Sequence, residues 1–388
     1  MSKKKTIFIS TGEVSGDLQG ALLIEALKRQ AKQDGLELEI VALGGERMAK
    51  AGATLLGDTT AIGSIGILES VPYLLPTWQI QRRAKQYLQQ HPPDLVVLID
   101  YLTPNLGIGS YLQRYLPKIP IVYYIAPQEW VWSIGSRKTD LIVSMTRRLL
   151  AIFPEEARYF KQRGAEVRWV GHPLVDRIQE FPSRTAARAA LGIEAEQLAL
   201  ALIPASRPQE LKYLLPTIFQ AAQQLQTQLP QVHFWIPLSL ELYRPKIASA
   251  IERYNLRATI VGDRTREVLA AADLAIAKSG TVNLELALLN VPQVVLYRVN
   301  PITVWLARTF LKFSIPFMSP PNLVVMKPIV PELLQEQATP ENIVKEATEL
   351  LLNPQKRQET LTNYQEMRRC LGEVGVCDRA AREIFSML

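Results

Sequence analysis

Short apolar runs rich in Val, Ile and Leu alternate along the chain with longer amphipathic stretches, and no other feature restricts the fold as much. This alternation is the pattern of parallel strands joined by crossover helices. The runs lack regular exchange of polar and apolar residues, as expected for strands buried on both faces. We therefore predict an α/β fold with strands at 6–10, 38–43, 94–100, 119–125, 141–145, 149–153, 167–170, 198–203, 233–237, 259–261, 274–277 and 294–297.

The length of 388 residues exceeds what one compact core usually holds and suits two domains. The strand pattern stops in the polar stretch 177–190 and then restarts. This predicts two Rossmann-like, doubly wound domains at 1–176 and 191–355, with a linker between them. Residues 356–388 are polar and helical, and in two-domain enzymes of this architecture such a tail commonly packs back on the first domain.

The charge balance gives a first indication of partners. Lysine and arginine number 44 against 37 aspartates and glutamates, a net charge of +7 that favours an anionic partner. No nucleic-acid-binding module or basic stripe is recognisable, so we do not expect nucleic acid to be that partner. No apolar run approaches the roughly 18 residues of a membrane span, and the N-terminus lacks the features of a signal peptide. Two cysteines without metal-ligand spacing fit a reduced, cytoplasmic setting.

The first predicted strand leads directly into the sequence T-G-E-V-S-G-D and then into a helix. Gly12 permits a tight turn, and Ser15 or Asp17 can cap the helix. The glycine spacing is not G-x-G-x-x-G, so a dinucleotide site is not supported. A structural turn would explain the glycines equally well. Glu13, however, brings a carboxylate to the end of the sheet where ligands of parallel α/β proteins bind.

A second carboxylate, Asp100, ends the predicted strand 94–100. A sugar transferase needs a group that accepts the proton of the attacking hydroxyl, and a carboxylate with a raised pKa does this. Because Asp100 and Glu13 follow strands of one sheet, we expect the two side chains to converge. The alternative for Asp100 is a structural cap of the next helix.

Two other signals in the first domain are weaker. Trp130 lies in a W-V-W sequence after a predicted strand, where tryptophans usually anchor the core but also flank sugar or lipid faces. His172, in G-H-P, is one of three histidines. A lone histidine is more often structural than catalytic, and we assign His172 to the cleft without a defined role.

The second domain offers cations and backbone amides after two of its predicted strands. Arg207 is placed to pair with a diphosphate, and Ser206 can add a hydrogen bond. The alternative is an ion pair between Arg207 and Glu210.

After the strand 274–277, the turn of Ser279, Gly280 and Thr281 can receive a phosphate on its backbone amides. Lys278 adds a cation beside this turn. Glu285, one helical turn further on, can accept hydrogen bonds from ribose hydroxyls. The lysine signature of a P-loop is missing, so nucleotide hydrolysis is not supported.

Several short motifs resemble, in order and spacing, those of the lipid-A-disaccharide synthase family over nearly the whole chain. They are GEVSGD at 12–17, GGERM at 44–48, IGILE at 65–69, Asp100 with Asn105, W-x-W at 130–132, GHPLVD at 171–176, SR at 206–207, SGT at 279–281 with Glu285, YR at 297–298, WLA at 305–307, PNL at 321–323 and ELLQE at 332–336. Each is short, but together they are very specific.

The resemblance implies a GT-B type fold with the active site in the cleft between two Rossmann-like domains. It implies transfer of a 2,3-diacylglucosaminyl group from UDP to 2,3-diacylglucosamine 1-phosphate, a lipid monosaccharide phosphate, in lipid A biosynthesis. The products are a β-1,6-linked disaccharide and UDP. Inversion at the sugar carbon implies one direct displacement. No cofactor or metal is implied, and we find no metal-ligand cluster in the sequence.

The same resemblance assigns roles to the residues singled out above. Asp100 is the expected general base, with Glu13 close to the reacting groups. The expected nucleotide-sugar-binding residues are Ser206, Arg207, Ser279, Gly280, Thr281, Glu285, Asn322 and Lys327. The residues expected at the acceptor or in the cleft are Gly12, Ser15, Asn105, Trp130 and His172.

The chain departs from the family pattern at a few positions. Tyr123 stands where a histidine is frequent, and Gln128-Glu129 replace a Ser-Val-like pair. The usual LAGR after PNL is V-V-M-K at 324–327, so that Lys327 keeps the charge of the arginine but loses its bidentate fork. This change puts the donor or acyl-chain preference in question.

Because both implied substrates are lipids, we expect contact with an anionic membrane surface. Trp305, Phe310 and Phe313 recur at helical spacing beside basic residues, which indicates either a core-packing helix or an interfacial patch. Residues 65–78 are a second candidate. We expect a cytoplasmic protein, peripheral on the inner face of the plasma membrane, and a homodimer stays compatible with the sequence.

Two other functions stay open at this point. A UDP-GlcNAc-dependent transferase acting on another lipid acceptor has the same fold, but its family has a GTGGH-type first loop where this chain has GEVSGD. A catalytically silent UDP-sugar-binding paralogue would explain the altered loop at Lys327. The presence of both Asp100 and Glu13 argues against it.

Overall fold

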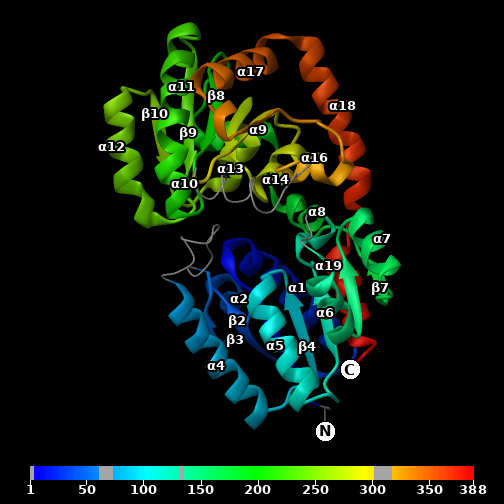
Figure 1. Ribbon diagram of the computed structural model, residues 1–388. Helices are drawn as coiled ribbons and strands as arrows, with labels where there is room; N and C mark the ends of the chain where they lie inside the picture. Colours follow the sequence, from blue (N-terminus) through cyan, green and yellow to red (C-terminus); the bar gives the residue numbers. More distant parts are fainter. Residues whose placement is uncertain (1–3, 61–72, 132–134, 301–316) are drawn as a thin grey trace. The chain divides into compact units, whose positions relative to one another are not determined.

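A computed structural model describes residues 4–60, 73–131, 135–300 and 317–388 of the chain. The chain forms two compact units, and each contains one parallel sheet (Figure 1). Unit 1 comprises Met1–Asp176 together with Leu371–Leu388, and unit 2 comprises Arg177–Cys370.

The sheet of unit 1 has the order β3-β2-β1-β4-β5-β6-β7, and all its paired strands are parallel. The strands are β1 (Lys4–Ser10), β2 (Glu37–Gly44), β3 (Thr54–Asp58), β4 (Leu95–Ile99), β5 (Ile121–Tyr124), β6 (Arg148–Ala151) and β7 (Val167–Trp169). The chain order reverses between β1 and β4, which makes the ends of these two strands the topological switch point of the sheet.

The helices of unit 1 are α1 (Glu13–Gln33), α2 (Glu46–Lys50), α4 (Leu74–Gln90), α5 (Leu102–Tyr115), α6 (Arg137–Met145), α7 (Pro154–Gln162), α8 (Leu174–Arg177) and α19 (Val376–Phe385). Side chains of α4, α5, α6 and α7 form one core cluster with alternate residues of the strands, including Phe8 and Tyr123. The C-terminal helix α19 packs against α1. The Asp176 carboxylate fixes the start of α19 by accepting hydrogen bonds from the amides of Gly375 and Cys377, at 2.6 and 2.7 Å.

The predicted strand at 141–145 is wrong, because these residues lie in α6. Within α6 the buried residues are Thr139, Ile142 and Met145, a spacing of three that matches a helix and not a strand. The run of three apolar residues at 141–143, followed by Met145, hid this longer period. We also did not predict β3, an edge strand whose residues are only partly buried.

The sheet of unit 2 has the order β10-β9-β8-β11-β12-β13 and is likewise parallel, with its switch point between β8 and β11. Its strands are β8 (Leu198–Ile203), β9 (Val232–Pro237), β10 (Ala258–Val261), β11 (Leu274–Lys278), β12 (Gln293–Tyr297) and β13 (Glu332–Leu334). Its helices are α9 (Arg184–Leu191), α10 (Pro208–Tyr213), α11 (Leu215–Gln228), α12 (Arg244–Tyr254), α13 (Thr265–Ala271), α14 (Val282–Leu288), α16 (Pro320–Val325), α17 (Pro340–Leu352) and α18 (Pro354–Leu371).

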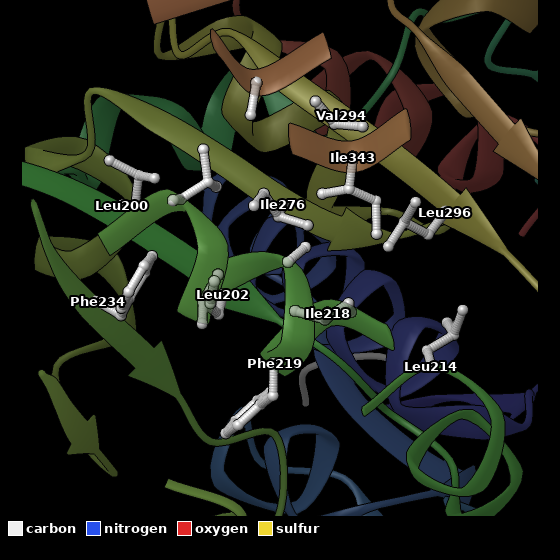
Figure 2. Packing of buried hydrophobic residues seen from close by; sticks show 14 of the residues in the cluster. Leu200, Leu202, Leu214, Ile218, Phe219, Phe234, Ile276, Val294, Leu296 and Ile343 are labelled. Carbon is white, nitrogen blue, oxygen red and sulfur yellow. The ribbon is translucent and has the colours of Figure 1, made fainter. Parts of the chain in front are cut away.

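Alternate residues of β8 enter two different cores. Leu200 and Leu202 pack with Ile218 of α11 and Ile343 of α17, as Figure 2 shows. The small residues between them, such as Ala201, face the cluster formed with α9 and α13. Because both faces of the strand are covered, it appears in the sequence as a continuous apolar run.

The stretch 177–190, which we interpreted as a linker, contains helical structure that belongs to unit 2. Ser183 caps the start of α9, because its hydroxyl accepts a hydrogen bond from the amide of Ala186 at 3.2 Å. Ala187 of this helix is buried in the cluster with α13. At the other end of the chain, α18 counts with unit 2 as far as Cys370, and residues 371–388 with unit 1.

Candidate functional site

The predicted carboxylates of unit 1 follow the two switch-point strands. Glu13 is three residues after β1, and Asp100 directly follows β4. Their loops are in contact, because a Cβ atom added to Gly12 would lie 2.5 Å from the ring of Tyr101. Burial raises the pKa of Tyr101, and the negative charge of Glu13 adds to this rise. The structure therefore brings Glu13 and the residue after Asp100 together, at the edge where open α/β sheets bind ligands.

Asp100 has an unusual backbone. Its φ is +44° and that of Tyr101 is +49°, a left-handed conformation that only a few per cent of residues other than glycine adopt. The carbonyl oxygen of Asp100 accepts hydrogen bonds from the side chains of Tyr123 and Asn105, both at 2.8 Å. The side chain of Asp100 is exposed, whereas the whole of β4 is buried. The turn thus directs the carbonyl into the protein and presents the carboxylate to solvent.

The buried side chain of Asn105 joins the ends of β1 and β4. Its Oδ1 accepts from the hydroxyl of Ser10 at 2.7 Å, and its Nδ2 donates to the carbonyls of Asp100 and Ile99 at 2.8 and 3.1 Å. These bonds explain the asparagine at position 105. They use the polar atoms of its side chain within the protein.

Helix α1 begins without a side-chain cap, so our prediction that Ser15 or Asp17 caps it is wrong. Ser15 is half-buried in the first turn. Asp17 is buried and accepts hydrogen bonds from the amides of Gly45, Arg47 and Met48, at 2.8, 3.2 and 3.1 Å. It therefore caps α2, because the loop places its carboxylate against the start of that neighbouring helix.

Trp130 and His172 both contact Phe153, with ring centroids 5.8 and 5.4 Å from its own. His172 Nδ1 accepts a hydrogen bond from the amide of Leu174 at 3.2 Å. Burial lowers the pKa of His172 to about 3, which keeps the ring neutral near pH 7. Both residues belong to an aromatic cluster of unit 1, and their assignment to the acceptor or the cleft stays a prediction.

Sequence reasoning missed Glu156, which is buried at the start of α7. Its carboxylate accepts hydrogen bonds from the amides of Ala126, Ile152 and Phe153, at 2.9, 2.8 and 3.2 Å, and so ties the ends of β5 and β6 together. Burial raises its pKa to about 7, and the charge of Asp100 contributes to the rise. A glutamate in the first turn of a helix is common on exposed surfaces, so no signal in the sequence indicates that Glu156 is buried.

In unit 2, the predicted cations also follow the switch-point strands. Arg207 follows β8 and Lys278 ends β11, and the carboxylate of Glu210 lies between them, 3.3 Å from the first and 3.8 Å from the second. The same carboxylate accepts hydrogen bonds from the amides of Ser206 and Arg207, at 2.6 and 3.0 Å. The ion pair that we considered as an alternative for Arg207 is thus present.

The turn after β11 uses several of its polar groups internally. The Ser279 hydroxyl donates to the carbonyl of Met318 at 2.6 Å, and the amide of Gly280 donates to Asn283 Oδ1 at 2.7 Å. Thr281, the residue before α14, is half-buried. Glu285 forms an ion pair with Arg177, a partner that sequence reasoning missed.

Asn322, which we predicted to bind the donor nucleotide sugar, is buried, and both polar atoms of its side chain form hydrogen bonds within the protein. Its Oδ1 accepts from the amides of Ile329 and Val330, and its Nδ2 donates to the carbonyl of Val330 and to the carboxylate of Glu332, over 2.7 to 3.0 Å. Lys327 is exposed and pairs with Glu366 of α18 at 2.6 Å. In this conformation Asn322 holds the loop after α16 in place.

The predicted membrane residues Trp305, Phe310 and Phe313 lie outside the described residues. Within the described ranges, no helix is long and apolar enough to cross a membrane. The same ranges contain no group of three or more His, Cys, Asp or Glu side chains arranged to hold a metal ion.

The whole chain matches known proteins. The model of the lipid-A-disaccharide synthetase family matches residues 7–385. The chain belongs to this family. It is 62% identical to the lipid-A-disaccharide synthase of Gloeothece citriformis, over 98% of this chain and 99% of that protein. It is 57% identical to the synthase of Synechocystis sp., over 98% and 97%.

Among solved structures, the S. aureus MnaA–UDP complex superimposes with a TM-score of 0.67 at 14% identity, over 99% of this chain and 98% of that one. At this identity the likeness shows the fold alone, and it is the GT-B-like fold predicted from the sequence. Membership of the synthase family identifies a glycosyltransferase of lipid A biosynthesis with lipid-A-disaccharide synthase activity. Its substrates are lipid A precursors, which argues against the two alternative functions.

Proposed function

We propose that the enzyme transfers a 2,3-diacylglucosaminyl group from UDP to 2,3-diacylglucosamine 1-phosphate, with Asp100 as the general base. The acceptor 6-hydroxyl oxygen forms the new bond to the donor sugar carbon, and the bond from that carbon to UDP breaks with its electron pair. The proton of the hydroxyl passes to the Asp100 carboxylate. The observation that carries this assignment is the exposed carboxylate at the switch point, on a backbone that is fixed in the left-handed conformation.

Unit 2 supplies the cations that we assign to the donor. Arg207 and Lys278 stand at the ends of the two switch-point strands, where a diphosphate would gain charge-assisted hydrogen bonds. Glu210 orients this pair of cations and holds the amides that precede α10. We assign Ser279, Thr281 and Glu285 to the rest of the nucleotide. Glu285 already has a cationic partner in Arg177, so ribose binding would engage a carboxylate that is held in place.

The decisive experiment supplies purified enzyme with both lipid substrates and measures UDP release and disaccharide formation. The variant D100N is expected to lower kcat by about 10² to 10⁴, the usual contribution of a general base, while UDP still binds. The exposed Asp140 of α6 provides the matched control, D140N, which should keep full activity. Disaccharide formation by D100N at the parental rate would remove Asp100 from this role.

We also propose that the enzyme docks on an anionic membrane from the cytoplasmic side. At the start of α4, three large apolar side chains are more than half exposed: Leu74 at 63%, Leu75 at 62% and Trp78 at 57%. The guanidinium of Arg82 lies 5.5 Å from the Trp78 ring centre. Exposed apolar side chains beside a cation are the combination that binds anionic lipid surfaces.

Sedimentation with lipid vesicles tests this docking. We expect binding to vesicles that contain phosphatidylglycerol, weaker binding to pure phosphatidylcholine, and partial release by salt. The variant L74S/L75S should lose most of the bound fraction. L242S, which alters an equally exposed leucine in unit 2, should not. Equal binding by all three proteins would contradict the proposal.

Sedimentation velocity separately distinguishes the 43.6 kDa chain from a homodimer.

A further inference from the structure

The peptide group on each side of Asp100 is bonded to the end of one neighbouring strand. The amide of Asp100 donates to the carbonyl of Ile125 at 2.9 Å, and its carbonyl accepts from the Tyr123 hydroxyl at 2.8 Å. Tyr123 is the third residue of β5, and Ile125 directly follows that strand. Asp100, which carries the exposed carboxylate, is therefore held by two hydrogen bonds to the end of β5, one to its main chain and one to the Tyr123 side chain.

These two hydrogen bonds join segments whose backbone is strained. Asp100, Tyr101 and Ile125 all have positive φ, between +44° and +61°. Such conformations persist only where surrounding contacts hold them. Ile125 is in turn fixed through the next residue, because the amide of Ala126 donates to the buried carboxylate of Glu156 at 2.9 Å. Without its donors, the peptide after Asp100 is free to rotate, and that rotation would redirect the carboxylate.

The Tyr123 side chain is suited to hold this carbonyl. It is fully buried and packs in the core of unit 1 with residues of α5 and α6, so its ring has one position. Burial raises the pKa of its phenol well above the ordinary value, which keeps the hydroxyl protonated as a donor. Asn105, the second donor to the same carbonyl, also serves Ile99 and Ser10.

We propose that Tyr123 is a positioning residue of the transfer reaction, which orients the Asp100 carboxylate through its hydrogen bond to the Asp100 carbonyl. The inference rests on the proposed role of Asp100 as the base. Tyr123 touches no substrate in this scheme. It determines how often the base points at the acceptor hydroxyl and leaves the binding of either substrate unchanged.

The chain contains a matched control for this proposal. Tyr124, the next residue, is also fully buried on β5, and its hydroxyl lies beside the side chain of Cys377 in α19. Y123F and Y124F therefore remove the same atom from adjacent buried sites. We expect Y123F to lower kcat about tenfold, the factor that corresponds to one net hydrogen bond, with both KM values within about twofold of the parent. Y124F should leave kcat and KM unchanged.

A double-mutant cycle separates positioning from a general structural effect. If Tyr123 acts through Asp100, adding Y123F to D100N should cost no further activity, because the carboxylate is already gone. Rates are expressed per UDP-binding site, so that loss of folded enzyme is not read as loss of kcat. Parental kcat in Y123F, or a full additional loss in the double variant, would overturn the inference. Parental activity in D100N alone would instead overturn the proposed base.

Discussion

The carboxylate of Glu210 lies 3.3 Å from the guanidinium of Arg207, within one turn of the same helix start. Lys278 approaches the same carboxylate from the neighbouring strand, at 3.8 Å. The two cations that the sequence assigns to a diphosphate thus share one counter-ion. If the two cations bind the diphosphate as we propose, this shared carboxylate holds them in a fixed geometry beforehand, which reduces the entropy lost on binding.

The first prediction concerns Arg207 and the affinity for UDP. R207A should weaken UDP binding by about 10- to 100-fold, the range for a hydrogen bond to a charged group, and R207K should recover only part of it because an ammonium lacks the guanidinium fork. Calorimetric titration with UDP measures both. K212A changes an exposed cation of the same helix and should bind like the parent. If R207A binds UDP at parental affinity, the diphosphate does not contact Arg207.

The parts of the site that could be predicted from sequence are those that follow buried strands. Glu13, Asp100 and Arg207 each follow a strand that appears as an apolar run, and within one sheet, geometry brings the carboxyl ends of neighbouring strands together. The strand order itself, which makes β1 and β4 neighbours, was not needed for that step. The α/β class and the doubly wound halves followed from the same runs.

The parts that could not be predicted depend on partners far away in sequence. Glu156 looks like an ordinary acidic residue of a first helical turn, and only the folded chain shows that it bonds the amide of Ala126. Likewise, only the folded chain shows that Glu210 approaches Lys278. Asp17 belongs to a motif at the start of α1 but caps α2. The period of α6 was hidden by its adjacent apolar residues, because a short apolar run fits a strand and a helix equally well.

The second prediction concerns Asn322, whose side chain is buried and hydrogen-bonded within unit 2. In N322D, the group that donates to Glu332 and to the carbonyl of Val330 becomes an acceptor, and a second carboxylate is buried beside Glu332. We expect a loss of at least about 3 kcal/mol in the free energy of unfolding. Urea denaturation measures it. N342D, in the half-exposed first turn of α17, is the control and should change stability little. A parental midpoint for N322D would show that the amide bonds carry no stability.

The third prediction follows from the pKa of Glu156, which is about 7 in the folded chain against an ordinary value of 4.5. Between these two values the folded state keeps a proton that the unfolded state releases, so this residue makes stability fall as pH rises, by at most about 1.4 kcal/mol per pH unit. E156Q cannot titrate. In thermal melts, the stability of the parent relative to that of E156Q should therefore fall from pH 5 to pH 8. E155Q, at the neighbouring position, should show no such change. A difference independent of pH would mean that Glu156 is already ionised at pH 5.

The fourth prediction has the opposite sign and concerns His172, whose pKa burial lowers to about 3 from 6.5. Between pH 3 and 6.5 the unfolded state binds a proton at this histidine and the folded state does not. The contribution of His172 to folding stability is therefore fully present above pH 6.5 and is lost as the pH falls. H172N keeps an acceptor oxygen near the position of Nδ1, which bonds the amide of Leu174, but it has no titrating ring. Its melting temperature should therefore fall less than that of the parent between pH 7 and pH 4, by a margin that corresponds to at most about 1.4 kcal/mol per pH unit. H91N, at an exposed histidine after α4, should follow the parent curve. Parallel curves for H172N and the parent would contradict the prediction, because they would show that the buried ring accepts a proton without cost.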